Sequence, residues 1–120
     1  MPKRRSLLVG RKLIMQDFAF AAAERGQHFF YIRIPEPVGP IDRGSKYEVP
    51  LSDALGELGE ITGGGSQMGD GGVIAFCGID VVVNHRDRGL KTIRACLESC
   101  GAPVGTIIEE YVPAYAELPL

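Results

Sequence analysis

A chain of 120 residues with 45% hydrophobic and 23% charged residues has the length and composition of one soluble globular domain. No apolar run approaches the roughly 20 residues of a membrane-spanning helix. Residues 1–25 carry six basic and two acidic side chains, a net of +4, whereas residues 26–120 carry seven basic and thirteen acidic ones, a net of −6. Because phosphate binding depends on Lys and Arg, this acidic body disfavours a nucleic-acid partner.

The N-terminal segment predicts a basic arm followed by a helix. Its start, "KRRSLLVGRK" (3–12), has an apolar part of only four residues, against roughly 7–15 in a secretory signal, so we expect a cytoplasmic protein. Residues 11–25 are rich in helix formers and end at Gly26, which is typical of a helix stop. This helix is apolar on nearly all sides and should therefore lie against another part of the protein.

Residues 27–58 predict a strand, a long loop and a short helix. The segment 27–35 is β-branched and aromatic and ends at Pro35. Three prolines and two glycines predict an irregular loop over 35–48, and long loops often carry function. A short helix over 49–58 follows, with Pro50 in its first turn.

The second half of the chain predicts two strands around a glycine-rich stretch, then a helix and a last strand. A strand begins at 59–62 and runs into "GGGSQMGDGG" (63–72). A long strand over 73–84 follows, with a bulge expected at Gly78. The helix over 87–100 has Asp87 as its expected N-cap, 105–112 is the last strand, and 113–120 is a tail.

These elements run in the order helix, then β-α-β-β-α-β, which resembles the ferredoxin-like arrangement. The expected fold is an α+β sandwich of one domain, residues 27–112. The basic arm and helix of residues 1–26 precede it, and the tail 113–120 follows it. Right-handed crossovers give the antiparallel sheet order 4-1-3-2, with both crossover helices on one face. Many unrelated functions share this architecture.

The glycine-rich stretch is the first candidate site. In the expected topology the loop 35–48, the hairpin 63–72 and the turn 101–105 meet at one end of the sheet. Glycines let backbone N–H groups converge on an anion, with positive charge supplied from the neighbouring loop. A slack hairpin is the alternative, because the Walker lysine and a following helix are both missing. The candidate ligand-binding residues are Arg43, Lys46, Gly63, Gly64, Gly65 and Ser66.

The second candidate site is the face of the sheet opposite the crossover helices. Strand alternation turns Phe30, Ile32 and Ile34 toward those helices and a mixed apolar and polar set the other way. The N-terminal helix or a second subunit should cover that face. RNA binding there is disfavoured, because "GIDVVV" (78–83) lacks the aromatic, basic signature of RRM domains. The candidate partner or dimer face consists of Phe29, Tyr31, Arg33, Asp80 and Val82.

Residues with reactive side chains form no visible catalytic set. His85 has no nucleophile or orienting partner beside it in sequence. Glu109 and Glu110 alternate across a strand, so we expect them to be solvated or to contact a partner rather than to act as a catalytic pair. Cys96 and Cys100 are four apart and share one helix face. We expect these cysteines to be packed apolar side chains, with a redox pair or a metal clip as alternatives. No catalytic residue, cofactor or metal is therefore expected.

Our leading hypothesis is a non-enzymatic protein-binding or regulatory module that acts on a protein partner or by self-association. Its size and acidic charge are those of small bacterial inhibitor or immunity proteins, for which opposite charge speeds association with a basic partner. The alternative is a small-molecule or anion-binding domain, or a minor enzyme, that uses the hairpin 63–72 and the loop 35–48.

Overall fold

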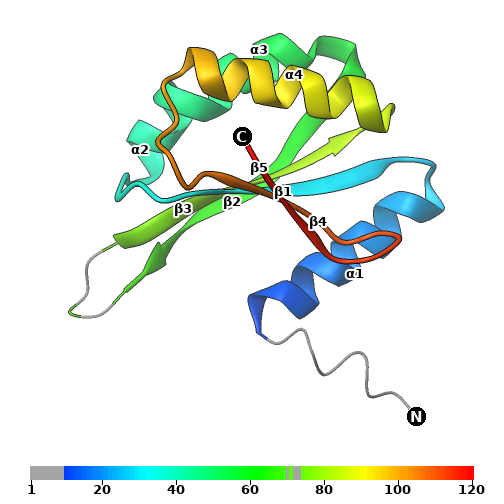
Figure 1. Cartoon of the computed structure of the whole chain (residues 1–120), viewed down its shortest axis with the longest axis horizontal. Helices are drawn as coiled ribbons and strands as arrows, with labels where there is room; N and C mark the ends of the chain where they lie inside the picture. The colour runs from blue at the N-terminus through cyan, green and yellow to red at the C-terminus, as the bar shows by residue number, and fades with distance from the viewer. Residues whose placement is uncertain (1–9, 70, 72–73) are drawn as a thin grey trace.

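The computed structural model describes residues 10–69, 71 and 74–120, so most of the expected basic arm lies outside the described residues. The described chain forms an α+β fold in which helices cover an antiparallel five-stranded sheet (Figure 1). In chain order the elements are α1 (Arg11–Glu24), β1 (His28–Ile34), α2 (Pro40–Arg43), a π-helical turn (Gly44–Glu48), α3 (Val49–Leu55), a 3₁₀ turn (Gly56–Leu58), β2 (Gly59–Met68), β3 (Ile74–Val83), α4 (Arg86–Ser99), β4 (Ile107–Glu110) and β5 (Ala116–Pro119).

The sheet has the strand order β2-β3-β1-β4-β5, and each neighbouring pair is antiparallel. The expected four-stranded order 4-1-3-2 is therefore not the order of this sheet, because the segment 113–120 contains a fifth strand. β5 pairs with β4 from Ala116 opposite Glu110 to Pro119 opposite Ile107. Leu118 on β5 also packs against the main core, so burial of an apolar side chain favours the return of this segment to the sheet.

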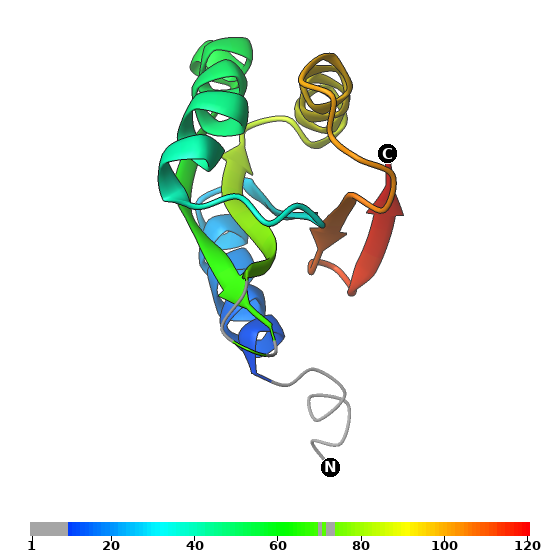
Figure 2. The same ribbon diagram turned by 90° about the vertical axis from the view of Figure 1, so that its left-hand side faces the viewer.

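The main hydrophobic core lies between the sheet and the layer formed by α3 and α4 (Figures 1 and 2). The predicted alternation of β1 is confirmed, because Phe30, Ile32 and Ile34 are fully buried on this face. The two helices contribute leucine and isoleucine side chains at helical spacing. These are Leu51, Leu55, Leu90, Ile93 and Leu97.

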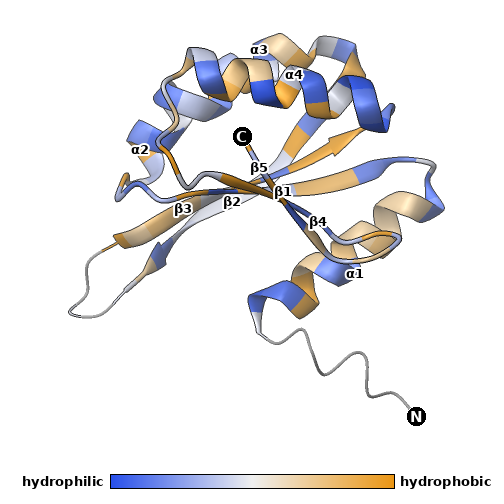
Figure 3. Ribbon diagram, in the orientation of Figure 1, coloured by the Kyte–Doolittle hydropathy of each residue, from blue (hydrophilic) through white to orange (hydrophobic). Residues whose placement is uncertain are grey.

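The N-terminal helix α1 covers the other face of the sheet. It is apolar along most of its length (Figure 3) and lies on the opposite side of the sheet from α3 and α4 (Figure 1). Met15, Ala19 and Ala22 of this helix pack against Phe29 and Tyr31 of β1 and form a second core. Of the two expected covers for this face, the N-terminal helix is therefore the one present in this chain.

Residues 40–48, expected to be irregular, are helical. Pro40 occupies the first turn of α2, where its missing N–H would have had no helical partner. The π-helical turn that follows buries Tyr47 in the main core. The prolines and glycines of this segment therefore do not prevent a helix, because the tyrosine anchors it to the core. The irregular part shrinks to residues 35–39.

The longest helices of the described segments, α1 and α4, have 14 residues each. Within those segments no helix is both long and apolar enough to cross a membrane. α4 begins at Arg86 with His85 in the N-cap position, so the expected N-cap Asp87 instead lies in the first turn. An acidic side chain there still interacts favourably with the helix dipole.

Candidate functional site

Residues 63–68 of the glycine-rich stretch belong to strand β2 and not to a hairpin loop. β2 and β3 pair residue by residue through it: Gly63 with Asp80, Gly64 with Ile79, Gly65 with Gly78 and Ser66 with Cys77. Successive N–H groups of an extended strand point in opposite directions, so these residues do not converge into an anion nest. β2 ends at Met68 and β3 begins at Ile74, and positions 70, 72 and 73 of the expected hairpin lie outside the described residues.

A bulge at Thr62 determines which way the glycines face. The register shifts between Ile61 and Gly63, so that Ile61 packs against the main core while Gly63 and Gly65 lie on the α1 side of the sheet. The bulge expected at Gly78 is not there, because Gly78 pairs in regular register with both neighbouring strands.

The space beside Gly78 is filled by an aromatic ring. A Cβ at this position would lie 1.8 Å from the Tyr31 hydroxyl oxygen and 2.2 Å from its Cζ. Tyr31 is buried, and the Arg11 guanidinium lies 4.5 Å from its ring centroid on the α1 side. Gly63 similarly leaves room for Asp80, whose Oδ2 lies 2.9 Å from the position of the missing Cβ. Gly78 and Gly63 therefore make space for Tyr31 and Asp80 of the same protein and not for a ligand.

Arg43, the first cation of the expected anion site, is already paired. Its Nε lies 2.6 Å from Glu48 Oε2, and its Nη1 donates to Ser66 Oγ at 3.2 Å. Ser66 in turn donates to the Val38 carbonyl at 2.9 Å. Gly64 lies beside this pair, since a Cβ there would be 3.0 Å from Glu48 Oε2. The structure thus brings Arg43, Gly64 and Ser66 together, but around a neutralised ion pair.

Lys46 lies in a different cluster. Its Nζ is 2.8 Å from Glu36 Oε2, and the Tyr47 hydroxyl donates to the other oxygen of the same carboxylate. Hydrogen bonds from Lys46 and Tyr47 hold the pKa of Glu36 below its ordinary value. Both cations of the expected anion site are therefore matched by nearby carboxylates.

The residues of the expected partner face lie beneath α1. Phe29, Tyr31 and Val82 are at most 4% exposed, and Asp80 is 9% exposed. Arg33 is half-buried and reaches a carboxylate on β4. In the folded chain these side chains contact α1 and β4, so a partner could reach most of them only if α1 moved away.

A buried acidic residue, Glu109 on β4, organises the contacts under α1. It is fully buried, and its carboxylate lies 2.8 Å from Arg11 Nη1 and 3.2 Å from Arg33 Nε. Tyr111 donates a short hydrogen bond to the same group. Burial alone would raise the pKa of Glu109, but hydrogen bonds from Arg11 and Tyr111 and the charges of both arginines hold it below its ordinary value. Glu109 is therefore ionised at neutral pH and fixes the start of α1 to the sheet.

The sequence did not reveal this role. Glu109 and its neighbour Glu110 were expected to be solvated or to contact a partner, yet both are buried, and Glu110 accepts a hydrogen bond from Arg86 Nη2 at 2.8 Å. Arg11 and Arg86, which bind Glu109 and Glu110 respectively, are 98 and 24 positions away along the chain. No local motif connects such partners; the available signal was two acidic residues inside an otherwise apolar strand.

The two edges of the sheet, β2 and β5, differ in how they are protected. β5 has four residues and ends at Pro119, which has no N–H to donate. β2 has ten residues, contains no proline, and Glu60 is its one charged residue. No strand within the described part of the chain pairs with the outer side of β2. That side therefore offers a row of backbone donors and acceptors.

Comparison with known proteins gives no function for this arrangement of residues. No family model, no curated protein and no solved structure matches the chain. The β2 edge, the buried ion pairs and the two free cysteines at the end of α4, Cys96 and Cys100, are therefore the features from which a function can be inferred.

Proposed function

We propose that the protein is a protein-binding module of the cytoplasm that takes up an extended segment of a partner along the edge of β2. The observation that carries the proposal is the ten-residue outer edge of β2, which has no proline and includes three consecutive glycines. A peptide that adds a strand to such an edge gains main-chain hydrogen bonds along its length. β5 is short and contains Pro119, so the proposal concerns β2 alone.

The expected partner segment is basic. Glu60 is exposed and is the charged side chain of β2, and residues 26–120 together carry a net charge of −6. Complementary charge speeds association and disfavours acidic competitors. The alternative of an anionic small ligand has less support, because Arg43 and Lys46 are both paired with carboxylates.

Capture with two glycine-to-lysine variants tests the proposal. Gly65→Lys places a positive charge on β2, and it has room, because the nearest atom to a Cβ at this position is 3.9 Å away. Gly39→Lys makes the same change before α2, where no atom lies within 4 Å of the new Cβ. Wild type and both variants serve as baits in a cell extract at low salt. Backbone hydrogen exchange of the purified complex then locates the contact.

We expect wild type and Gly39→Lys to retain the same basic protein, and Gly65→Lys to lose roughly tenfold or more in affinity, about 1.4 kcal/mol. Residues 59–68 should exchange more slowly in the complex. A chain that stays monomeric and retains no protein contradicts the proposal. So does a captured protein that binds Gly65→Lys as well as wild type, or slowed exchange confined to α1.

A further inference from the structure

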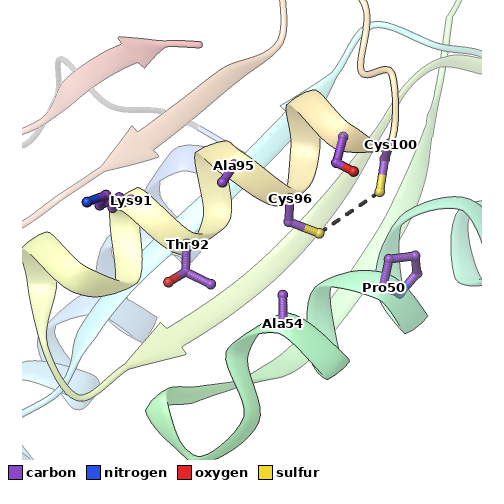
Figure 4. A pocket seen from close by; sticks show the side chains of 8 residues that line it. Pro50, Ala54, Lys91, Thr92, Ala95, Cys96 and Cys100 are labelled. Carbon is purple, nitrogen blue, oxygen red and sulfur yellow. Dashed lines mark hydrogen bonds between the residues drawn. The ribbon is translucent and has the colours of Figure 1, made fainter.

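The groove between α3 and α4 contains two cysteines, Cys96 and Cys100, that pack at the margin of the main core and take no part in the β2 proposal. Cys96 lies in α4, and Cys100 is the C-cap of the same helix. Their sulfur atoms are 4.0 Å apart, as expected for two residues on one helix face, and both line a groove of about 520 Å³ (Figure 4). Pro50 and Ala54 of α3 line the opposite side of the groove.

We propose that this groove binds a soft monovalent metal ion, Cu(I), between the thiolates of Cys96 and Cys100. Thiolates are the protein ligands that select Cu(I). No histidine or carboxylate lines the groove, and the residues that the structure describes contain no group of three or more His, Cys, Asp or Glu side chains suited to a metal. Cations that need about four to six ligands, such as Zn²⁺ or Mg²⁺, therefore find too few here.

The helix geometry favours an ion between the sulfurs over a direct disulfide. Cβ atoms four positions apart on a helix are separated by about 5–6 Å, whereas a disulfide requires roughly 3.5–4.5 Å. Closing a disulfide would therefore require the last turn of α4 to unwind. Two collinear metal–sulfur bonds of about 2.3 Å, the length typical of zinc, span roughly 4.6 Å. The observed sulfur separation of 4.0 Å is close to that span, so a small side-chain rotation suffices.

Binding replaces two protons by one ion. Coordination by the dithiol breaks two S–H bonds, forms two S–Cu bonds, releases two protons and leaves copper in the +1 state. Because protons compete with the ion, its affinity rises with pH. Both side chains are half-buried, which leaves the ion a path from solution.

An anaerobic titration of the full chain with Cu(I), delivered as its bicinchoninate complex, tests the site. Cys96→Ser and Cys100→Ser each remove one ligand. Cys77→Ala is the matched control, because Cys77 is fully buried in the main core and does not line the groove. Wild type and Cys77→Ala should each withdraw one Cu(I) per chain, with a sulfur-to-copper absorption band in the near ultraviolet and release of protons. Each serine variant should lose at least roughly tenfold in affinity.

Alkylation by iodoacetamide gives a readout that needs no variant. One equivalent of Cu(I) should protect Cys96 and Cys100 together, as measured by mass spectrometry of the labelled peptides. Unchanged labelling of both cysteines, Cu(I) binding by Cys96→Ser as tight as that of wild type, or binding lost in Cys77→Ala would each overturn the proposal. The groove lies between the helices rather than at β2, so this site can fail while the β2 proposal stands.

Discussion

Gly78 and Tyr31 lie on neighbouring strands, and a side chain at position 78 would compete with Tyr31 for the same space. The ring of Tyr31 occupies the space that a side chain at Gly78 would need, and Arg11 covers the ring from the α1 side. Arg11 also reaches Glu109 on β4. Because these side chains touch one another, a change at one of them is expected to alter the energetic effect of changes at the others.

Gly78→Ala is expected to lower the free energy of unfolding by about 1–3 kcal/mol, the usual range for overpacking a filled site. Its Cβ would lie 1.8 Å from the Tyr31 hydroxyl oxygen. Gly65→Ala is the matched control, because Gly65 pairs with Gly78 and the nearest atom to its Cβ position is 3.9 Å away. Urea denaturation should place the control within about 0.5 kcal/mol of wild type. Equal losses in the two variants would contradict this explanation.

Asp80 and Glu109 are expected to respond to pH in opposite directions. Burial raises the pKa of Asp80, and the charge of Arg11 offsets only part of this rise. The folded chain therefore holds this proton more tightly than the unfolded chain, and stability falls as pH rises from 3.8 through the raised pKa. The pKa of Glu109 is lowered, so its contribution is complete above about 4.5 and is lost as pH falls through the folded value.

Asp80→Asn is therefore expected to raise the free energy of unfolding at pH 7, and the gain should shrink toward about pH 4. Glu109→Gln should lower the free energy of unfolding at pH 7 by about 2–3 kcal/mol. This is less than the loss expected when one partner of a fully buried ion pair is removed. The reason is that Arg11 and Arg33 are 21% and 30% exposed. Denaturation at both pH values measures these effects. An Asp80→Asn variant less stable than wild type at pH 7 would be inconsistent with the raised pKa.

Among the elements, α1 lies close to the sheet because its inner side carries small residues. Ala19 and Ala22 are almost fully buried there. Ile14, Phe18 and Phe20 are each about half exposed, and the ring of Phe18 contacts Phe29 of β1 edge-on. The helix thus approaches the sheet closely at its alanines, while three of its larger apolar side chains lie partly in solvent.

Ala22→Leu is expected to destabilise the fold by about 1–3 kcal/mol, because three further carbon atoms have no space between α1 and β1. The neighbouring Ala23 is exposed, so Ala23→Leu makes the same chemical change without that penalty. Alanine and leucine both have high helix propensity, so a change in helix propensity does not explain the expected loss of stability. Thermal and urea denaturation of the two variants measure the difference. If Ala23→Leu proved as destabilising as Ala22→Leu, close packing of α1 would not be the cause.

The elements that the sequence predicted well are those whose local apolar spacing matches the way they pack in the fold. In α4 the spacing of Leu90, Ile93 and Leu97 is helical, and all three are buried. β2 was predicted too short because its glycines have low strand propensity, and what makes them a strand is the pairing with β3. β5 was missed for a similar reason, since Pro119 disfavours a strand and Leu118 gains its core contact only in the folded chain.

The candidate site was less predictable than the fold. The sequence placed Arg43 and Lys46 in one candidate site, but it could not show that Glu48 and Glu36 neutralise them in two separate clusters. The carboxylates are only five and ten positions away, yet helical and loop geometry decide whether such pairs form. The partners of Glu109 come from distant elements, so only the folded chain brings them together.

In the whole molecule, one sheet supports two cores. Along β1, Phe30 and Ile32 enter the main core, while Phe29 and Tyr31 enter the core under α1. Neither α1 nor the layer formed by α3 and α4 can detach from the sheet without exposing apolar side chains of this central strand to water. The two layers are therefore expected to unfold together.

This coupling can be measured through tyrosine, because the chain contains no tryptophan. In Tyr47→Phe the remaining tyrosines, Tyr31, Tyr111 and Tyr115, all lie on the α1 side of the sheet. Near-ultraviolet circular dichroism then reports that side, and the far-ultraviolet signal reports all helices and strands. We expect the two thermal midpoints to coincide, as in a two-state transition. An earlier midpoint in the tyrosine signal would mean that α1 detaches independently.

The unequal edges of the sheet also limit how far an assembly could grow. If two copies joined through β2, each would use the edge proposed to accept a strand, and the outer edges of the pair would both be β5. Those edges are short and end in proline, so a third copy would find no template. Such a pair is symmetric and closed, whereas a fibre needs an adhesive edge on both sides of every subunit. A sheet with one open and one blocked edge can thus accept a strand without open-ended polymerisation.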